Sequence, residues 1–180
     1  MHMYLVFAVI FILSLVLVWF VKHYAAELGL IDVPNDRSTH SNHTPRGAGI
    51  GFYLAIALVL PVFYFDVMLS YASTCTAVLL VFIVGLLDDH RDTSPNTKFF
   101  VIILSTVLLY FDNIVIDHLG LFFGFELSLG WLALPFTIFA VVGFTNALNL
   151  IDGLDGLAAT VSIVILGSFF TVGVMYDDLF

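Results

Sequence analysis

Asparagine and aspartate side chains gather in one short stretch of an otherwise apolar chain, NALNLIDGLDGLAA at residues 146–159. Asn149, Asp152 and Asp155 follow one another at intervals of three residues, so each successive pair can share one helical turn. A hydrophilic hinge needs only one Asp-Gly pair and has no use for Asn146 and Asn149 inside an apolar run. Because polar groups at membrane depth are costly and usually functional, the pattern favours a ligand site.

A second polar stretch, GLLDDHRD at residues 85–92, also follows an apolar run. If the helix continues, Asp92 shares a face with Asp88, four residues earlier, and with Asp89, three residues earlier. Like charges so placed repel, and a bound Mg²⁺, or Mn²⁺, would relieve that repulsion. Such ions take oxygen ligands and are often shared with substrate phosphates. The alternative interpretation is a solvated acidic helix end, partly paired with Arg91 and Lys98.

The loop IDVPNDRSTHSNHTPRGAG, residues 31–49, supplies hydrogen-bond donors in Arg37, His40 and Arg46. The planar guanidinium group of arginine suits phosphate recognition because it donates paired hydrogen bonds. A flexible loop that carries the usual positive charge of cytoplasmic loops would explain the arginines, but it gives no reason for the proline, histidine and glycine pattern.

The composition indicates whether the loops are carried by a water-soluble domain or by a membrane protein. Of 180 residues, 61% are hydrophobic and 11% are charged, with a mean hydropathy of +1.10. A water-soluble domain of this length cannot bury so much apolar surface, so the chain is an integral membrane protein. A net charge of −9 argues against a nucleic-acid partner, and the single cysteine, Cys75, can form no intrachain disulfide.

Crossing the bilayer core takes about 20 apolar residues in a helix. The sequence therefore predicts an all-α, polytopic membrane helix bundle that forms one domain over residues 1–180. The first apolar run has no Lys or Arg before Lys22, which favours a retained helix with its N-terminus outside. The predicted spans are residues 3–21, 48–65, 71–87, 99–116, 131–150 and 157–175.

The positions of the basic residues orient this bundle. All five Lys and Arg residues lie in residues 22–47 and 88–98, whereas the opposite loops carry only acidic charges. The positive-inside rule makes the basic loops cytoplasmic. Counting spans then places residues 146–156 on the same face. Acidic ligands, phosphate-binding cations and a membrane setting together suit a reaction that joins a lipid phosphate to a nucleotide substrate through Mg²⁺.

The three loops resemble the motifs of the bacterial polyprenyl-phosphate N-acetylhexosamine-1-phosphate transferases, glycosyltransferase family 4. DVPNDRSTHSNHTPRGAGIGF looks most like the O-antigen and lipopolysaccharide branch, the undecaprenyl-phosphate N-acetylglucosamine-1-phosphate transferases. GLLDDHRDTSPNTK is similar to the family's aspartate loop, and NALNLIDGLDGLAA matches its most distinctive motif. Ala48 and His43 depart from the first motif, in place of Gly and Pro.

The resemblance implies transfer of a sugar 1-phosphate from a UDP-N-acetylhexosamine to undecaprenyl phosphate, with release of UMP. It places the enzyme in the bacterial plasma membrane, with its active-site loops on the cytoplasmic face and a homodimer as an open alternative. Asp88 and Asp89 would be the catalytic residues, with Asp88 deprotonating the lipid phosphate. Asn149 and Asp152 would hold the metal. The residues implied in substrate binding are Arg37, His40, Arg46, Asp92, Lys98, Asn146 and Asp155.

Members of the family are longer and carry two further motifs, a Gly-Asp-x-Gly-Ser loop and a His-rich loop. We therefore expect this chain to be the N-terminal half of a transferase and to be inactive alone. The alternatives are an intramembrane prenyltransferase, which also uses aspartate-rich loops, a non-catalytic remnant, and a transporter or channel. A transporter would place charges within its spans, whereas nearly all charges here lie in loops.

Overall fold

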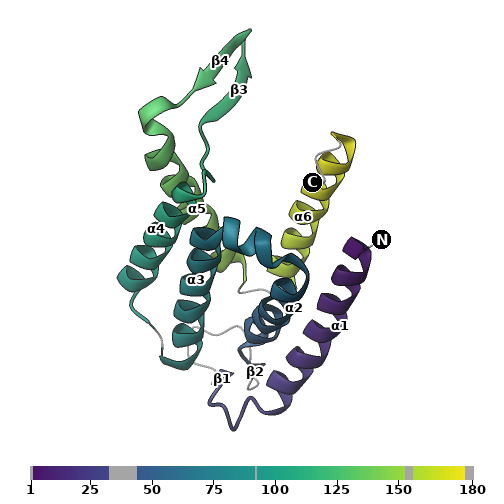
Figure 1. Cartoon of the computed structure of the whole chain (residues 1–180). Coiled ribbons are helices and arrows are strands. Elements are labelled where there is room, and N and C mark those ends of the chain that lie inside the picture. Colours follow the sequence, from purple (N-terminus) through teal and green to yellow (C-terminus); the bar gives the residue numbers. More distant parts are fainter. Residues whose placement is uncertain (1, 33–43, 92, 153–155, 177–180) are drawn as a thin grey trace. The chain divides into compact units, whose positions relative to one another are not determined.

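The computed structural model describes residues 2–32, 44–91, 93–152 and 156–176. Most of these residues are helical, and five helices are long and apolar enough to cross a membrane. The prediction of an all-α polytopic membrane protein is confirmed. The helices, labelled in Figure 1, are α1 (His2–His23), α2 (Ala48–Ser70), α3 (Ala72–Arg91), α4 (Pro95–Phe111), α5 (Ala133–Ile151) and α6 (Leu157–Met175).

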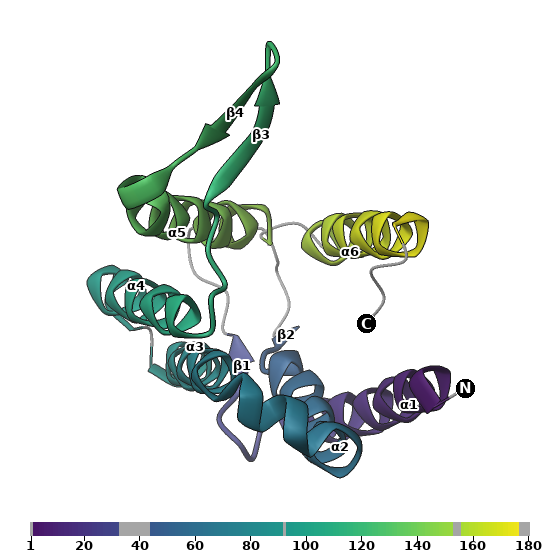
Figure 2. The same ribbon diagram turned by 45° about the horizontal axis from the view of Figure 1, so that its top comes forward.

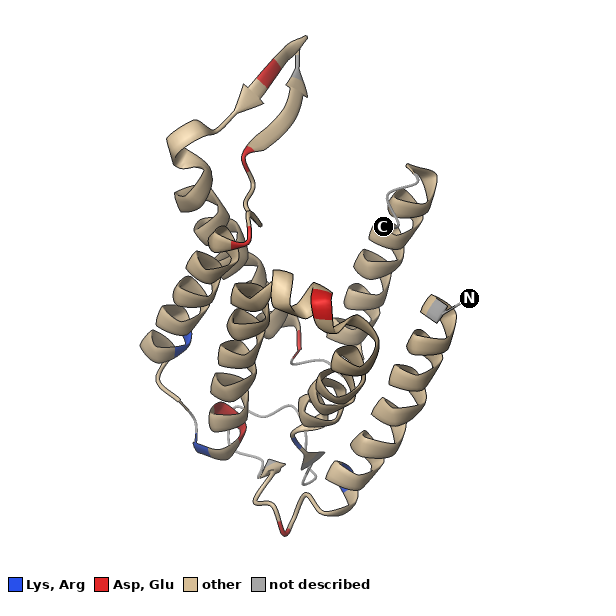
Figure 3. Cartoon of the chain, viewed as in Figure 1, with Lys and Arg blue, Asp and Glu red and all other residues tan. Residues whose placement is uncertain are grey.

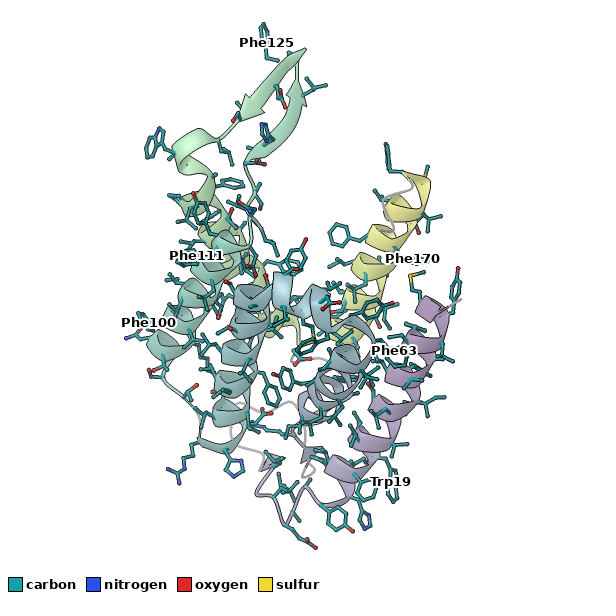
Figure 4. The ribbon with its side chains drawn as sticks, viewed as in Figure 1. Trp19, Phe63, Phe100, Phe111, Phe125 and Phe170 are labelled. Carbon is teal, nitrogen blue, oxygen red and sulfur yellow. The ribbon has the colours of Figure 1, made fainter. Side chains whose placement is uncertain are left out.

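Large apolar side chains cover the outside of these helices. Figure 4 shows examples in Trp19, Phe100, Phe111 and Phe170, all of which are exposed. A helix that is apolar around most of its circumference is stable only where lipid or protein surrounds it. The exposed apolar surface is therefore the surface that meets lipid or further protein.

The chain forms two compact units, residues 1–138 and residues 139–180. The prediction of one domain over residues 1–180 stays a prediction. In the first unit, α1 packs on α2, and α3 packs on α4 (Figure 2). The second unit contains the rest of α5 and the whole of α6.

The contact between α1 and α2 depends on a missing side chain. Gly51 is buried against α1, and a Cβ atom at this position would lie 2.7 Å from the Val18 backbone nitrogen. Only glycine therefore allows the two helix backbones to approach this closely. Farther along, the backbone of α2 is non-helical at Tyr64, three residues after Pro61, so the helix is broken near its predicted end at residue 65.

The chain leaves α1 through a capped turn that closes the base of the first polar loop. The Leu30 N–H donates to the Ala25 carbonyl, the Gly29 N–H donates to Ala26, and Gly29 has a φ of 68°. This Schellman arrangement buries Leu30 against Ala25. Strands β1 (Ile31–Asp32) and β2 (Thr44–Pro45) then pair antiparallel, so both ends of the loop are tied together.

The fourth predicted span, residues 99–116, was too long at its outer end. Helix α4 ends at Phe111 in a second Schellman arrangement, with Asn113 at a φ of 59° and the Ile114 N–H donating to Leu109. A hairpin that the sequence did not predict follows, formed by β3 (His118–Phe122) and β4 (Phe125–Ser128). The short 3₁₀ helix η1 (Gly130–Leu132) leads from this hairpin into α5.

Candidate active site

Asp88, at the end of α3, is held by both of its carboxylate oxygens. Oδ2 forms an ion pair with Lys98 Nζ at 2.7 Å, while Oδ1 accepts from the Thr93 N–H and hydroxyl, each at 2.9 Å. These contacts stabilise the ionised carboxylate. Asp88 is thus paired with Lys98. This pairing is the one expected from the alternative interpretation of residues 85–92, an acidic helix end partly paired with basic residues.

Helix α4, which carries Lys98, begins with an N-cap at Ser94. The Ser94 hydroxyl accepts from the Thr97 N–H at 3.2 Å, and Pro95 occupies the first turn of α4, where its missing N–H costs nothing. The sequence SPNT carries this capping signal, so Ser94 could have been recognised from the sequence. The role of Thr93 depends on a contact that no local pattern predicts.

Arg46 reaches the same region from the first loop. Its N–H donates to the Leu30 carbonyl at 2.8 Å, and the following residue, Gly47, has a φ of 88° and is buried. Arg46 lies close enough to Asp89 for the two charges to attract each other. The structure therefore brings together four of the predicted residues, Arg46, Asp88, Asp89 and Lys98.

Basic charge lies at one end of the described part of the first unit. Figure 3 shows the described Lys and Arg residues where α1 and α3 finish and α2 and α4 begin. At the other end, where Asp66 lies near the end of α2 and Asp112 follows α4, the figure shows acidic residues and no Lys or Arg among the described residues. The arrangement agrees with the charge asymmetry that oriented the predicted bundle.

The second unit presents the amide and carboxylate groups of the 146–159 stretch. Asn146 and Asn149 lie in the last turns of α5, and the Asp152 N–H donates to the Leu148 carbonyl at 3.2 Å. The helical path therefore continues to Asp152, so Asn149 and Asp152 share one turn. All three side chains are exposed.

Four predicted site residues, Arg37, His40, Asp92 and Asp155, lie outside the described residues. Within the described residues no group of three His, Cys, Asp or Glu side chains could hold a metal ion. The donors that are present nevertheless fit a shared ion. Mg²⁺ in phosphate-handling sites is commonly held by one or two protein oxygens plus substrate phosphates, and Asn149 and Asp152 offer two exposed oxygen donors on one turn.

The chain was compared with known proteins. It is 33% identical over 171 residues to the probable undecaprenyl-phosphate N-acetylglucosaminyl 1-phosphate transferase of Bacillus subtilis, covering 94% of this chain and 47% of that protein. It is 32% identical over 168 residues to the undecaprenyl-phosphate alpha-N-acetylglucosaminyl 1-phosphate transferase of Escherichia coli K12, covering 92% and 45%. The protein of that name from Yersinia pestis is 31% identical over 161 residues, covering 88% and 44%.

The chain thus spans about half the length of the curated relatives it matches. No solved structure matches it. A family model described as glycosyl transferase family 4 matches residues 71–180, which include the Asp88 cluster and the 146–159 stretch. From this match, and from the agreement of the relatives over nearly the whole chain, we conclude that the chain belongs to glycosyl transferase family 4.

Proposed function

We propose that this chain forms the substrate-binding face of a phosphoglycosyl transferase, which moves a HexNAc-1-phosphate from a UDP-N-acetylhexosamine to undecaprenyl phosphate. The observation that carries the proposal is the ion pair of Lys98 with Asp88, next to Asp89, whose charge Arg46 from the first loop also attracts. In such a group the two cations can bind a phosphate, and a carboxylate can accept a proton. The names of the relatives support this choice of reaction and favour N-acetylglucosamine as the sugar.

The reaction needs one phosphorus–oxygen bond to form and one to break. An oxygen of the lipid phosphate attacks the β-phosphorus of the UDP-sugar, and the bond from that phosphorus to the bridging oxygen breaks, so UMP leaves with the electron pair. A proton on the lipid phosphate passes to a carboxylate. The family resemblance implied Asp88 for this step. Because Lys98 and Thr93 already hold Asp88, we assign the step to Asp89.

The remaining residues bind and orient the substrates in this proposal. Lys98 and Arg46 hold phosphate oxygens, and Asn146 with its neighbours on α5 contacts the donor. Asn149 and Asp152 would hold a Mg²⁺ or Mn²⁺ ion, which when bound neutralises the diphosphate and polarises its phosphorus–oxygen bonds. We place these groups on the cytoplasmic face of the bacterial plasma membrane, because the basic residues lie there by the positive-inside rule.

The glycan that this lipid-linked sugar begins is a finer proposal. The first loop resembles the O-antigen branch, so we propose that the product enters O-antigen or lipopolysaccharide synthesis rather than cell-wall synthesis.

UMP release tests the assignment of the site. Membranes containing the complete gene product should release UMP from UDP-N-acetylglucosamine and undecaprenyl phosphate with Mg²⁺. We expect Asp89→Asn and Asp152→Asn each to lower this rate by roughly a hundredfold or more, the range for losing an acid–base group or a metal ligand. Asp66→Asn makes the same change near the end of α2 that lies away from Arg46, and it should leave the rate unchanged. Full activity in both site variants would contradict the site.

A further inference from the structure

Thr93 lies in the turn between α3 and α4 and has no place in the proposed reaction so far. Its side chain is half-buried, and both its N–H and its hydroxyl donate to Asp88 Oδ1, each over 2.9 Å. A hydroxyl that shares one carboxylate oxygen with the backbone N–H of its own residue fixes that oxygen from two directions. Thr93 therefore restricts the rotation of the Asp88 carboxylate.

The other oxygen of this carboxylate, Oδ2, holds Lys98 Nζ at 2.7 Å. With Oδ1 fixed by Thr93, the direction in which Oδ2 points is fixed as well. Lysine has a long, flexible side chain, so an anchored partner removes much of the freedom of its ammonium group before any ligand arrives. The Lys98 side chain is still 35% exposed, which leaves it accessible to an incoming anion.

A separate set of contacts fixes the backbone from which Lys98 projects. The Ser94 hydroxyl caps α4 through the Thr97 N–H, and the Ser94 and Thr97 hydroxyls lie 2.8 Å apart. These contacts do not involve Asp88. Two threonines four residues apart thus have different partners: Thr93 contacts the Asp88 carboxylate, and Thr97, in the first turn of α4, contacts the cap residue Ser94.

We propose that Thr93 is a positioning residue that orients the Asp88 carboxylate and, through it, presents the Lys98 ammonium group to a substrate phosphate. The final step of this inference, the meeting of Lys98 with a phosphate, rests on the proposed function. The first step, the control of Lys98 by Thr93, depends only on the contacts within this turn.

The chain offers a direct way to observe Lys98, because it contains only two lysines, Lys22 and Lys98. We would label lysine with ¹³C at Cε and record both signals by NMR from the chain in detergent micelles. Asp88→Asn, which removes the ion pair, defines the position of the released Lys98 signal. Thr93→Val should move the Lys98 signal toward that position, and Thr93→Ser, which keeps the hydroxyl, should leave it near the wild-type position.

Two comparisons separate this effect from general damage to the fold. Thr97→Val makes the same change four residues later and should leave the Lys98 signal in place. The Lys22 signal, at the end of α1, should be the same in all variants. If Thr93→Val does not fold, Thr93→Ala serves instead, with the same expected shift. An unmoved Lys98 signal in folded Thr93→Val or Thr93→Ala would overturn the proposal, as would equal shifts in Thr93→Ser and Thr93→Val.

A second arm adds UDP-N-acetylglucosamine and Mg²⁺ to the complete gene product labelled in the same way, in which the Lys98 signal is the one that Lys98→Arg removes. A shift of the Lys98 signal in the wild type that is reduced in Thr93→Val supports the whole inference. If the ligand moves the Lys98 signal of neither protein, the meeting of Lys98 with a phosphate is wrong and the proposed function loses support. The control of Lys98 by Thr93 is judged by the first arm alone.

Discussion

The sequence presented two alternative expectations for Asp88. Its position in an aspartate motif predicted a role at the substrate, and the paired-helix-end interpretation predicted contact with Lys98. The structure shows the contact with Lys98, at 2.7 Å. The role at the substrate stays a prediction, and we propose that the contact orients Lys98 for a phosphate. What the spacing could not predict was Thr93, because hydrogen bonds from a turn to a preceding helix end depend on how that turn folds.

His118, at the start of the β3–β4 hairpin, makes a contact that depends on pH. Its Nδ1 lies 2.9 Å from Asp117 Oδ1, and its Nε2 lies 3.7 Å from Glu126 Oε1 on the opposite strand. The hydrogen bond to Asp117 raises the pKa of His118 above 6.5, and the same bond lowers the pKa of Asp117 below 3.8.

The signs of these shifts define the pH range in which this contact stabilises the hairpin. The stabilisation from protonated His118 is complete below pH 6.5 and is lost as the pH rises through its raised pKa. The stabilisation from ionised Asp117 is present above pH 3.8 and is lost as the pH falls through its lowered pKa. We therefore expect the amides of β3 and β4 to be most protected from exchange, relative to their intrinsic exchange rates, between about pH 4 and 6.5.

Hydrogen exchange followed by mass spectrometry checks this expectation, with His118→Gln as the comparison. In this variant the protection of the hairpin amides should no longer fall as the pH rises above 6.5. Equal protection of the hairpin at pH 5.5 and pH 8.5 in the wild type, after correction for the intrinsic exchange rate, would contradict it.

Helix ends were the least predictable features at the scale of the elements. The apolar run from Phe99 to Ile116 suggested one continuous span, but Asn113 adopts a positive φ that ends α4. The hairpin was missed because its two-residue turn is Phe123-Gly124, with φ values of 50° and 84°, where the usual signal is Asn-Gly or Asp-Gly. Phe123 is 99% exposed, so no contact within the described residues offsets its unfavourable backbone conformation.

Asp112 contributes to the outer end of α4 and at the same time caps a neighbouring helix. Its Oδ2 accepts from the N–H and the hydroxyl of Thr74, in the first turn of α3, at 2.6 and 2.7 Å. The residues are 38 positions apart. Such a cap satisfies a free N–H of α3 from another element, and no local sequence rule predicts it.

The crossing of α1 and α2 yields a prediction with a matched control. In Gly51→Ala the new methyl group would meet Val18, so the helices must separate, and we expect a loss of about 1–3 kcal/mol of unfolding free energy. A Cβ atom at Gly49 would meet nothing within 4 Å, so Gly49→Ala should be neutral or slightly stabilising.

Thermal unfolding of the chain in detergent micelles, followed by circular dichroism, compares these two variants. Equal midpoints for Gly51→Ala and Gly49→Ala would show that the close approach at Gly51 does not control the packing of α1 on α2.

At the scale of the whole molecule, composition and length were enough to predict six apolar helices. The bilayer imposes this regularity, since a span needs about 20 apolar residues and internally paired backbone groups. The placement of Arg46 at the same end as Asp89 needed only an even number of spans between their loops, and Asp88 and Lys98 belong to one loop. The contacts among these residues needed tertiary structure, because each joins residues whose side chains are brought together by packing.

The reaction itself is the central claim, and the fate of the β-phosphate tests it most directly. Membranes containing the complete gene product would receive UDP-N-acetylglucosamine labelled with ³²P at the β-phosphate, together with undecaprenyl phosphate and Mg²⁺. The account predicts that the label moves into the lipid fraction as a diphosphate-linked sugar while unlabelled UMP accumulates in the water phase. Release of UDP that still carries the label, or release of inorganic diphosphate without any labelled lipid, would contradict it.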